Sequence, residues 1–194
     1  MPTLYLASAS PRRVELLGQA GLKPRVIPAQ VPEIRRSGEG PAAMVLRLAR
    51  AKAEEVAGRL AARGAKEGWV LAADTTVALG ARVLEKPRDA AHARAMLKSL
   101  SGRVHTVHTG VCLVDLAPLP REAAAFVEAT KVFFRRLSAA EIRDYVATGE
   151  PLDKAGAYGI QGAAGAFVRR IEGDYCNVVG LPLARVVETL RSLN

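Results

Sequence analysis

Residues 69–84 read WVLAADTTVALGARVL and contain the features that decide the fold. The first five residues form a continuous apolar run, which is typical of a strand buried on both faces. The second half predicts a hairpin that turns at Gly80 and Ala81. Asp74 stands between these parts, where a carboxylate at the end of a buried strand can hold a metal, accept a proton from water or bond nearby backbone.

Helix and strand signals alternate outward from this stretch to both ends of the chain. Ser10-Pro11 and Asp89 are helix-start signals, and Ser138 with Glu141 forms a capping box. The patterns predict helices over 11–20, 41–63, 90–100 and 139–148 and from about 182, with strands over 4–7, 23–28, 69–73, 75–79, 82–84, 104–114, 126–134 and 166–171. Hairpins together with helical crossovers indicate an α/β fold with a mixed sheet.

The composition is that of a globular domain. The chain has 194 residues, 49% hydrophobic and 24% charged, and we interpret residues 1–194 as one domain. It has no apolar run long enough to cross a membrane and no basic start before an apolar stretch, so neither a membrane partner nor a secretory signal is expected. Two cysteines are too few for a disulfide framework, which favours the reducing cytoplasm.

The chain is strongly basic. Its 28 Lys and Arg outnumber its 19 Asp and Glu, and 21 of the 28 are Arg. A net charge of +9 attracts anions such as nucleic acid, an acidic membrane or a phosphorylated small molecule. Replacement of Lys by Arg in a GC-rich genome explains most of this excess, so only arginines within motifs are treated as functional.

Common catalytic motifs are absent from the sequence. There is no GxxxxGK[ST] phosphate loop, no GxGxxG after a strand, no HExxH and no GxSxG. His105 and His108 are three residues apart in a predicted strand, so they face opposite sides and cannot bind one metal. Cys112 lies in an apolar strand and is interpreted as a core residue.

The segment Ser8-Ala-Ser-Pro-Arg-Arg13 joins a buried strand to a helix start. Free amides and the helix dipole favour an anion there, and two hydroxyls and two guanidiniums add donors for phosphate. Capping alone explains Ser10. It does not explain Arg12 and Arg13 in a first turn, where positive charge opposes the dipole, so the segment indicates a bound anion.

Other polar residues have less specific signals. Lys86 follows the hairpin and Lys52 lies in the long helix, where each can reach a phosphate or be solvated. Glu33 lies in a loop. The glycine-rich stretch that contains Lys154 and Gln161 permits close approach of the backbone to a ligand, and an amide supplies both a donor and an acceptor for a base or sugar. Together these features predict phosphoryl-group hydrolysis of a small nucleotide.

Motifs over nearly the whole chain resemble those of the Maf family of nucleoside triphosphate pyrophosphatases. The matching blocks are LASASPRR (6–13), AADTTV (72–77), EKP (85–87), LSGRVH (100–105), EPLDKAGAYGIQG (150–162) and GDYCNVVGLPL (173–183), together with Glu33 and Lys52. Asp74-Thr75 is similar to the branch that acts on dTTP and UTP. One departure is that Pro32 precedes Glu33, where relatives often carry paired acids.

The resemblance implies a mixed, bent sheet flanked by helices, with two lobes around a deep cleft as in inosine triphosphate pyrophosphatases. It implies cleavage of a nucleoside triphosphate between the α and β phosphates, with a divalent cation, usually Mg²⁺ or Mn²⁺. Asp74 is then the proton acceptor for the attacking water. The implied specificity positions are Arg12, Thr75 and Gln161. The residues that line the triphosphate and metal are Ser8, Arg13, Glu33, Lys52, Lys86 and Lys154, with Glu33 and Asp74 as metal ligands.

The sequence leaves two alternative functions and the oligomeric state of the protein open. The family's link to septum formation suggests a non-catalytic, nucleotide-binding regulator of cell division. The charge suggests a nucleic-acid binder, but 1 Trp, 4 Tyr and 4 Phe offer few stacking platforms and no such motif is present, so specific nucleic-acid binding is not expected. Relatives are commonly homodimers, which makes a homodimer possible here.

Overall fold

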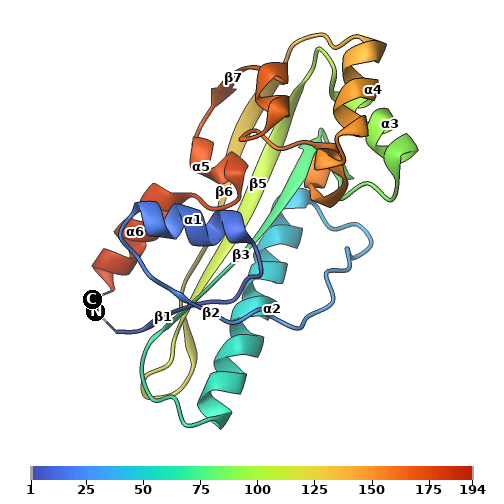
Figure 1. Cartoon of the computed structure of the whole chain (residues 1–194). Coiled ribbons are helices and arrows are strands. Elements are labelled where there is room, and N and C mark those ends of the chain that lie inside the picture. Colours follow the sequence, from blue (N-terminus) through green and yellow to red (C-terminus); the bar gives the residue numbers. More distant parts are fainter. Residues whose placement is uncertain (1, 194) are drawn as a thin grey trace.

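The computed structural model describes residues 2–193, which are built around a seven-stranded mixed sheet (Figure 1). The strand order is β2-β1-β3-β5-β6-β7, and β4 pairs with β3 on the same side as β1. The first two strands run parallel to their neighbours and the others antiparallel, which confirms the mixed sheet. The strands are β1 Leu4–Leu6, β2 Arg25–Val26, β3 Trp69–Leu79, β4 Arg82–Leu84, β5 Val104–Asp115, β6 Arg121–Phe134 and β7 Val168–Glu172.

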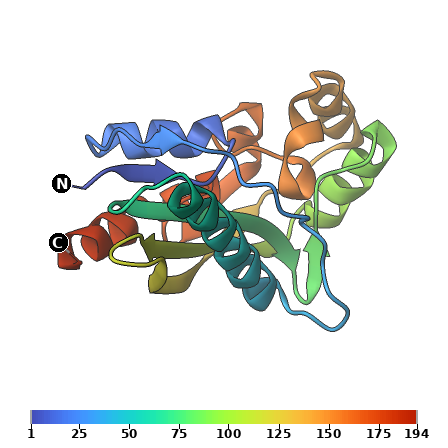
Figure 2. The same ribbon diagram turned by 90° about the horizontal axis from the view of Figure 1, so that it is seen from below.

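In the orientation of Figure 1, helices cover both faces of the lower half of the sheet, which Figure 2 shows from below. Alternate residues of β3 face opposite sides, so Leu71 packs with α1 and α6, whereas Val70 packs with α2. None of the helices described in residues 2–193 is long and apolar enough to cross a membrane. The helices are α1 Pro11–Gln19, α2 Pro41–Ala62, α3 Ala90–Leu100, α4 Ala139–Ala147, α5 Tyr175–Val179 and α6 Leu183–Ser192.

A separate core fills the other end of the molecule. There α3 and α4 pack with the far ends of the long strands and with an aromatic group in which Phe134 contacts His105, Tyr158 and Phe167 edge-on. The expected glycine-rich loop contains three short 3₁₀ helices, η1 Glu150–Asp153, η2 Ala155–Ala157 and η3 Ala163–Phe167. Because β3, β5 and β6 run through both ends, they join two lobes into one sheet.

The expected break in the strand at Asp74 is wrong. Residues 69–79 form one continuous strand, because β5 pairs with it from Trp69 to Ala78, with Asp74 opposite Gly110. The other edge of β3 is not continuously paired. There β1 pairs with residues 69–71 and β4 with residues 77–79, so no described strand pairs with residues 72–76 on that side. Asp74 therefore lies at a gap in the sheet edge instead of beyond a strand end.

Several element boundaries also differ from the sequence prediction. The second strand shortens to two residues, β6 begins at Arg121 instead of 126, and α5 was not predicted. Ser10 occupies the N-cap position of α1, but its side chain makes no capping bond. The caps at Asp89 and Ser138 are confirmed, since Asp89 Oδ1 accepts from the His92 amide at 2.7 Å and the capping box of α4 is complete.

Gly110 lets α2 lie close against the sheet. A Cβ at this position would overlap the backbone of Val45 and Leu46 on α2. Gly110 is opposite Asp74 in the register, and Lys52 follows Val45 by two turns of the same helix. The close approach at Gly110 therefore sets how near Lys52 comes to Asp74.

We predict that Gly110→Ala destabilises the protein by about 1–3 kcal/mol, because the helix backbone must move away from the added methyl group. Urea unfolding monitored by circular dichroism measures the change. Gly58→Ala on the exposed side of the same helix is the control: nothing lies near its Cβ, and we expect a gain of about 0.5–1 kcal/mol. Equal stabilities for the two variants would contradict the close approach at Gly110.

Candidate active site

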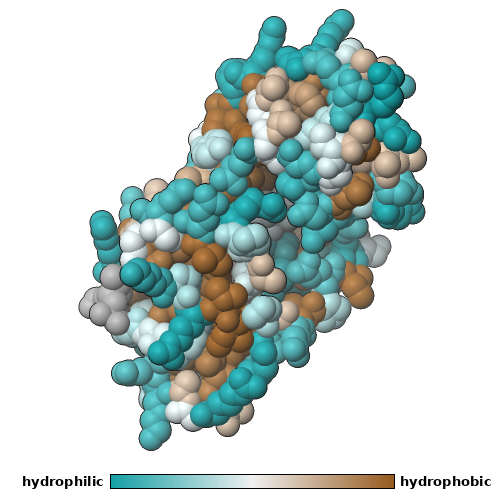
Figure 3. Space-filling model, viewed as in Figure 1, coloured by the Kyte–Doolittle hydropathy of each residue, from teal (hydrophilic) through white to brown (hydrophobic). Residues whose placement is uncertain are grey.

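A cleft of about 660 Å³ lies between the two lobes, at the gap in the edge of β3. Figure 3 shows the same face hollowed between the upper and lower parts of the molecule. Every residue that the sequence analysis selected for a site lines this cleft: Ser8, Arg12, Arg13, Glu33, Lys52, Asp74, Thr75, Lys86, Lys154 and Gln161. The structure thus brings together residues that span more than 150 positions of sequence, without itself assigning their roles.

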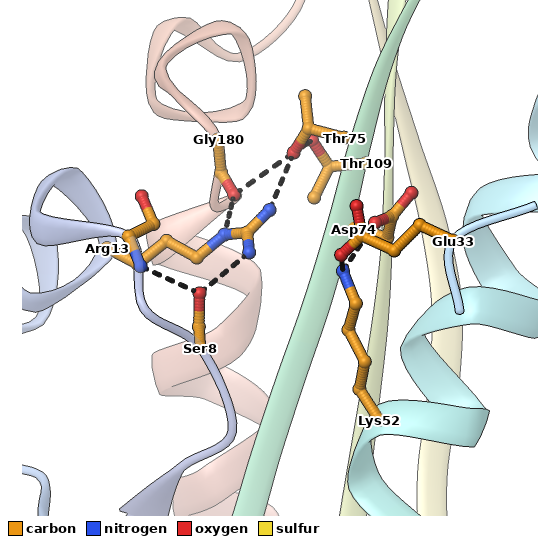
Figure 4. A network of polar contacts seen from close by, with 9 residues as sticks. Ser8, Arg13, Glu33, Lys52, Asp74, Thr75, Thr109 and Gly180 are labelled. Carbon is orange, nitrogen blue, oxygen red and sulfur yellow. Dashed lines mark hydrogen bonds and ion pairs between the residues drawn. The ribbon is translucent and has the colours of Figure 1, made fainter. Parts of the chain in front are cut away.

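The gap explains how one strand supplies two different polar groups (Figure 4). Asp74 and Thr75 are consecutive, so their side chains point to opposite faces of the sheet. Asp74 meets Lys52 of α2 on one face, and Thr75 meets Arg13 of α1 on the other. With no neighbouring strand at residues 72–76, both faces open into the same cleft.

Arg13 is held by three neutral oxygen acceptors. Its Nε donates to the Gly180 carbonyl at 2.9 Å, Nη1 donates to Ser8 Oγ at 2.9 Å, and Nη2 donates to Thr75 Oγ1 at 3.1 Å. A guanidinium has five N–H groups, so these bonds leave two for a ligand. The short segment between β1 and α1 supplies Ser8, the first turn of α1 supplies Arg13, and Gly180 follows α5.

The positive charge of Arg13 is buried without an ion pair. No carboxylate within residues 2–193 forms a salt bridge with it, although its residue is only 9% exposed. Burial lowers the pKa of Arg13, while the more distant charges of Asp74 and Glu33 raise it. A buried cation without a counter-ion is costly, so this position favours an incoming anion. That agrees with the sequence interpretation of the segment.

Lys52 joins two carboxylates on the other face. Its Nζ lies 2.7 Å from Asp74 Oδ1 and 2.5 Å from Glu33 Oε1. Lys52 and Asp74 are buried, whereas the side chain of Glu33 is half-exposed in the loop before α2. Asp74 Oδ2 makes no hydrogen bond within the described part of the chain. This oxygen can therefore receive a proton or contact a cation.

Environment moves the pKa values of the two carboxyl groups in opposite directions. Burial raises the pKa of Asp74, and the nearby Lys52 and Arg13 only partly oppose it. Burial also acts to raise the pKa of Glu33. The hydrogen bond and charge of Lys52 oppose burial, as do the charges of Lys86 and Arg13, and the overall result is a lowered pKa for Glu33. Asp74 is consequently a stronger base than an ordinary aspartate, and Glu33 is a weaker base than an ordinary glutamate.

The remaining predicted residues lie around the cleft rim. Lys154 Nζ donates to the Glu150 carbonyl at 2.8 Å and to Asp153 Oδ1 at 2.6 Å, which orients it. Lys86 and Gln161 are exposed and Arg12 is half-buried, and the side chains of these three form no hydrogen bond or ion pair within residues 2–193. They are free to contact a bound ligand.

A family model described as "Maf-like protein" matches residues 3–193, a range that includes every residue of the cleft. The chain belongs to the Maf family. Among relatives of this Maf protein, one named dTTP/UTP pyrophosphatase from Anaeromyxobacter dehalogenans is 54% identical, with 98% of this chain and 93% of the relative covered. One of the same name from Salmonella typhimurium is 52% identical, covering 100% of this chain and 94% of the relative.

The Maf chain also has a weak likeness to a solved structure. A nucleoside-triphosphatase, also titled dITP/XTP pyrophosphatase, from Mycobacterium abscessus gives a TM-score of 0.39 at 15% identity, covering 70% of this chain and 75% of that one. At that score the likeness carries no argument. The family assignment rests on the sequence relatives and on the match over residues 3–193.

Three parts of the site of this Maf protein were not predicted from its sequence. The Gly180 carbonyl accepts from Arg13, and Thr109 of β5 bonds to Thr75 at 2.9 Å. Neither has a local signal, because a backbone carbonyl and a threonine within a strand are ordinary. The helix α5 did have one: Asp174 accepts hydrogen bonds from the amides of Cys176 and Asn177, which is a normal N-cap.

We predict that Lys52→Met destabilises the protein by about 3–5 kcal/mol at pH 7, since it leaves the Asp74 charge buried without its partner. The loss of Lys52 raises the Asp74 pKa further above its ordinary value of 3.8. The native state then holds a proton that the unfolded chain releases, so stability falls as pH rises and the loss is smaller at pH 5 than at pH 7.

Urea unfolding at the two pH values measures this difference. Lys98→Met on the exposed side of α3 is the control, and we expect it to stay within about 0.5 kcal/mol of wild type at both. A Lys52→Met loss that is independent of pH would contradict the coupling to Asp74.

Proposed function

We propose that this chain hydrolyses dTTP and UTP between the α and β phosphates, giving the nucleoside monophosphate and pyrophosphate. One observation carries the proposal: a buried guanidinium without a counter-ion and a buried carboxylate with a free oxygen open into the same cleft. The first suits a polyanion and the second suits a water molecule that must lose a proton. The names of relatives at 50–54% identity supply the nucleotides.

Asp74 is the proposed proton acceptor. Its Oδ2 is free, and its pKa is raised by burial, so it takes a proton from water more readily than an ordinary aspartate. Lys52 holds the other oxygen at 2.7 Å and so fixes the direction of the carboxylate. The water attacks the α phosphorus, and pyrophosphate leaves.

Cationic side chains would neutralise the triphosphate. Arg13 presents two N–H donors from a fixed position, and Lys86 and Lys154 line the same cleft. Cations that are already in place need not reorient when negative charge shifts to the leaving group. Positioning and electrostatic stabilisation would therefore supply most of the catalysis.

A divalent cation fits this donor set as a partner of the substrate. No group of three metal-ligating side chains occurs among residues 2–193, so the protein offers no closed cage. Mg²⁺ typically binds through one or two carboxylates plus substrate phosphates. Asp74 and Glu33 would hold it on the protein side, and it would supply charge neutralisation of the phosphates.

A screen of nucleotides tests the proposal. Purified protein is incubated with dTTP, UTP, CTP and GTP, with Mg²⁺, with Mn²⁺ or with excess EDTA, and pyrophosphate and orthophosphate are both measured. We expect pyrophosphate from dTTP and UTP, well ahead of CTP and GTP, and none with EDTA. Orthophosphate as the first product, or preference for GTP or CTP, would overturn the proposal.

We predict that Asp74→Asn lowers kcat for dTTP at least about a hundredfold while the fold persists, because an amide cannot take the proton. Asp144→Asn on exposed α4 is the matched control and should keep wild-type kcat. Circular dichroism checks the fold of both. Near-normal turnover by Asp74→Asn would show that Asp74 is not the proton acceptor. Recovery of turnover with excess Mn²⁺ would show that Asp74 acts as a metal ligand instead.

We predict that kcat/KM for dTTP falls from wild type to Arg13→Lys and falls again to Arg13→Ala. An ammonium keeps the charge but cannot reach three protein acceptors and two ligand oxygens at once. Arg143→Ala, at an exposed position of α4, is the control for loss of one positive charge. Equal kcat/KM in the Lys variant, the Ala variant and wild type would show that Arg13 does not contact the substrate.

The assembly and cellular predictions complete the proposal. We expect a protein of the reducing cytoplasm that does not bind nucleic acid or membranes specifically. A homodimer is possible, and light scattering coupled to gel filtration measures the assembly. The names of the relatives describe an enzyme and do not favour a non-catalytic regulator of septum formation. Binding of dTTP without pyrophosphate release would favour the regulator.

A further inference from the structure

A chain of hydrogen bonds runs from the cleft into the protein core through residues outside the predicted site. Thr109 lies directly opposite Thr75 in the pairing of β3 and β5 and is fully buried. Its hydroxyl lies 2.9 Å from Thr75 Oγ1 and 3.2 Å from the Asn177 carbonyl. Thr75 in turn receives the Arg13 Nη2 donor at 3.1 Å. Four residues from four elements are thus linked in one series.

The Asn177 carbonyl determines the direction of the hydrogen on Thr109. This carbonyl lies near the end of α5, where the Gly180 and Leu181 amides both donate to Cys176 instead. Thr109 is therefore the donor available to it. A buried carbonyl left unpaired costs about 1–3 kcal/mol, so the single Thr109 hydrogen points to Asn177.

The direction at Thr109 determines the direction at Thr75. Because Thr109 has no second hydrogen, the 2.9 Å contact between the two hydroxyls requires Thr75 to donate. The Gly180 carbonyl, 3.3 Å away, also draws this hydrogen inward. Arg13 can only donate, so it occupies one lone pair of Thr75. Thr75 is left with one lone pair and no hydrogen for the cleft.

An acceptor in this position selects the kind of group that it contacts. Phosphate oxygens accept hydrogen bonds, so they do not suit Thr75, whereas an N–H or O–H of the ligand does. Thymine and uracil carry a donor at N3 between two carbonyl acceptors. Cytosine has an acceptor at N3, which would face the lone pair of Thr75. Arg12 and Gln161 line the same cleft, and their side-chain donors, which make no hydrogen bond within residues 2–193, suit the flanking carbonyls.

We propose that Thr109 is a specificity-determining positioning residue: it orients the Thr75 hydroxyl so that Thr75 accepts a hydrogen bond from N3–H of thymine or uracil. This inference rests on the proposed function and assigns base choice within it to a buried residue that does not touch substrate. The sugar hydroxyls are the other O–H source that the ligand offers, and the experiment separates them from the base.

The experiment compares kcat/KM for dTTP and dCTP in wild type, Thr109→Val, Thr109→Ser and Thr106→Val. Valine keeps the shape of threonine but leaves Thr75 only the longer bond to Gly180, so its hydrogen can turn outward to cytosine N3. We expect the dCTP to dTTP ratio to rise roughly three- to tenfold, the equivalent of one hydrogen bond. Thr109→Ser keeps the hydroxyl and should restore the wild-type ratio.

Thr106 is a matched control on the same strand. It is half-buried and its hydroxyl has no hydrogen-bond partner in residues 2–193, so its valine variant should leave the ratio unchanged. An equal ratio in Thr109→Val and Thr106→Val would overturn the inference. Wild type that cleaves no nucleotide would instead overturn the proposed function, so the two failures are distinct.

Two substrate analogues test wild type directly and remain decisive if Thr109→Val fails to fold. 3-Methyl-dTTP lacks the N3 donor, and 3′-deoxy-dTTP lacks the sugar hydroxyl. We expect kcat/KM to fall at least about tenfold for the first, because a donor is lost and a methyl group faces Thr75, and to change little for the second. The reverse pattern would place the Thr75 acceptor against the sugar and overturn the assignment.

Discussion

The gap in the edge of β3 is the constraint on which the rest of the site depends. Pairing with β5 is continuous over residues 69–78, while β1 and β4 leave residues 72–76 unpaired on the other side. A fully paired edge would cover Asp74 and Thr75 with a neighbouring strand. A chain break at this point would let the side chains move. The observed pairing lets two consecutive polar residues face the cleft while β5 still holds their backbone in the sheet.

The charged groups on the two faces of the gap are compensated differently. On the α2 face, Lys52 compensates two carboxylates, and Gly110 allows the helix to come near enough for that contact. On the α1 face, Arg13 is bonded only to neutral oxygens and keeps an uncompensated charge. A polyanion that enters the cleft contacts a cation without a counter-ion on one side and a base on the other. Different residues would therefore bind the polyanion and accept the proton.

Buried residues behind the cleft orient a side chain that lines it. Thr109 and Asn177 do not line the cleft, yet together they determine which way the Thr75 hydroxyl points. Asn177 itself is fully buried and anchored to β5 and β6 through the Val107 carbonyl and Thr130. Base choice would thus depend on core hydrogen bonds that connect the cleft to the centre of the sheet, and not only on residues in contact with ligand.

The amino-acid sequence by itself determined the α/β class with a mixed sheet, most of the elements, the family and the ten candidate residues that the cleft brings together. Local patterns suffice for these, because apolar runs, the caps at Asp89 and Ser138 and contiguous motifs lie within short stretches. Only the tertiary structure decided that Asp74 lies within a strand, that Lys52 holds it, and that Arg13 lacks a counter-ion. These facts depend on pairing between β3 and β5 and on contacts such as Arg13 with Gly180, which are 167 positions apart. No local preference records them.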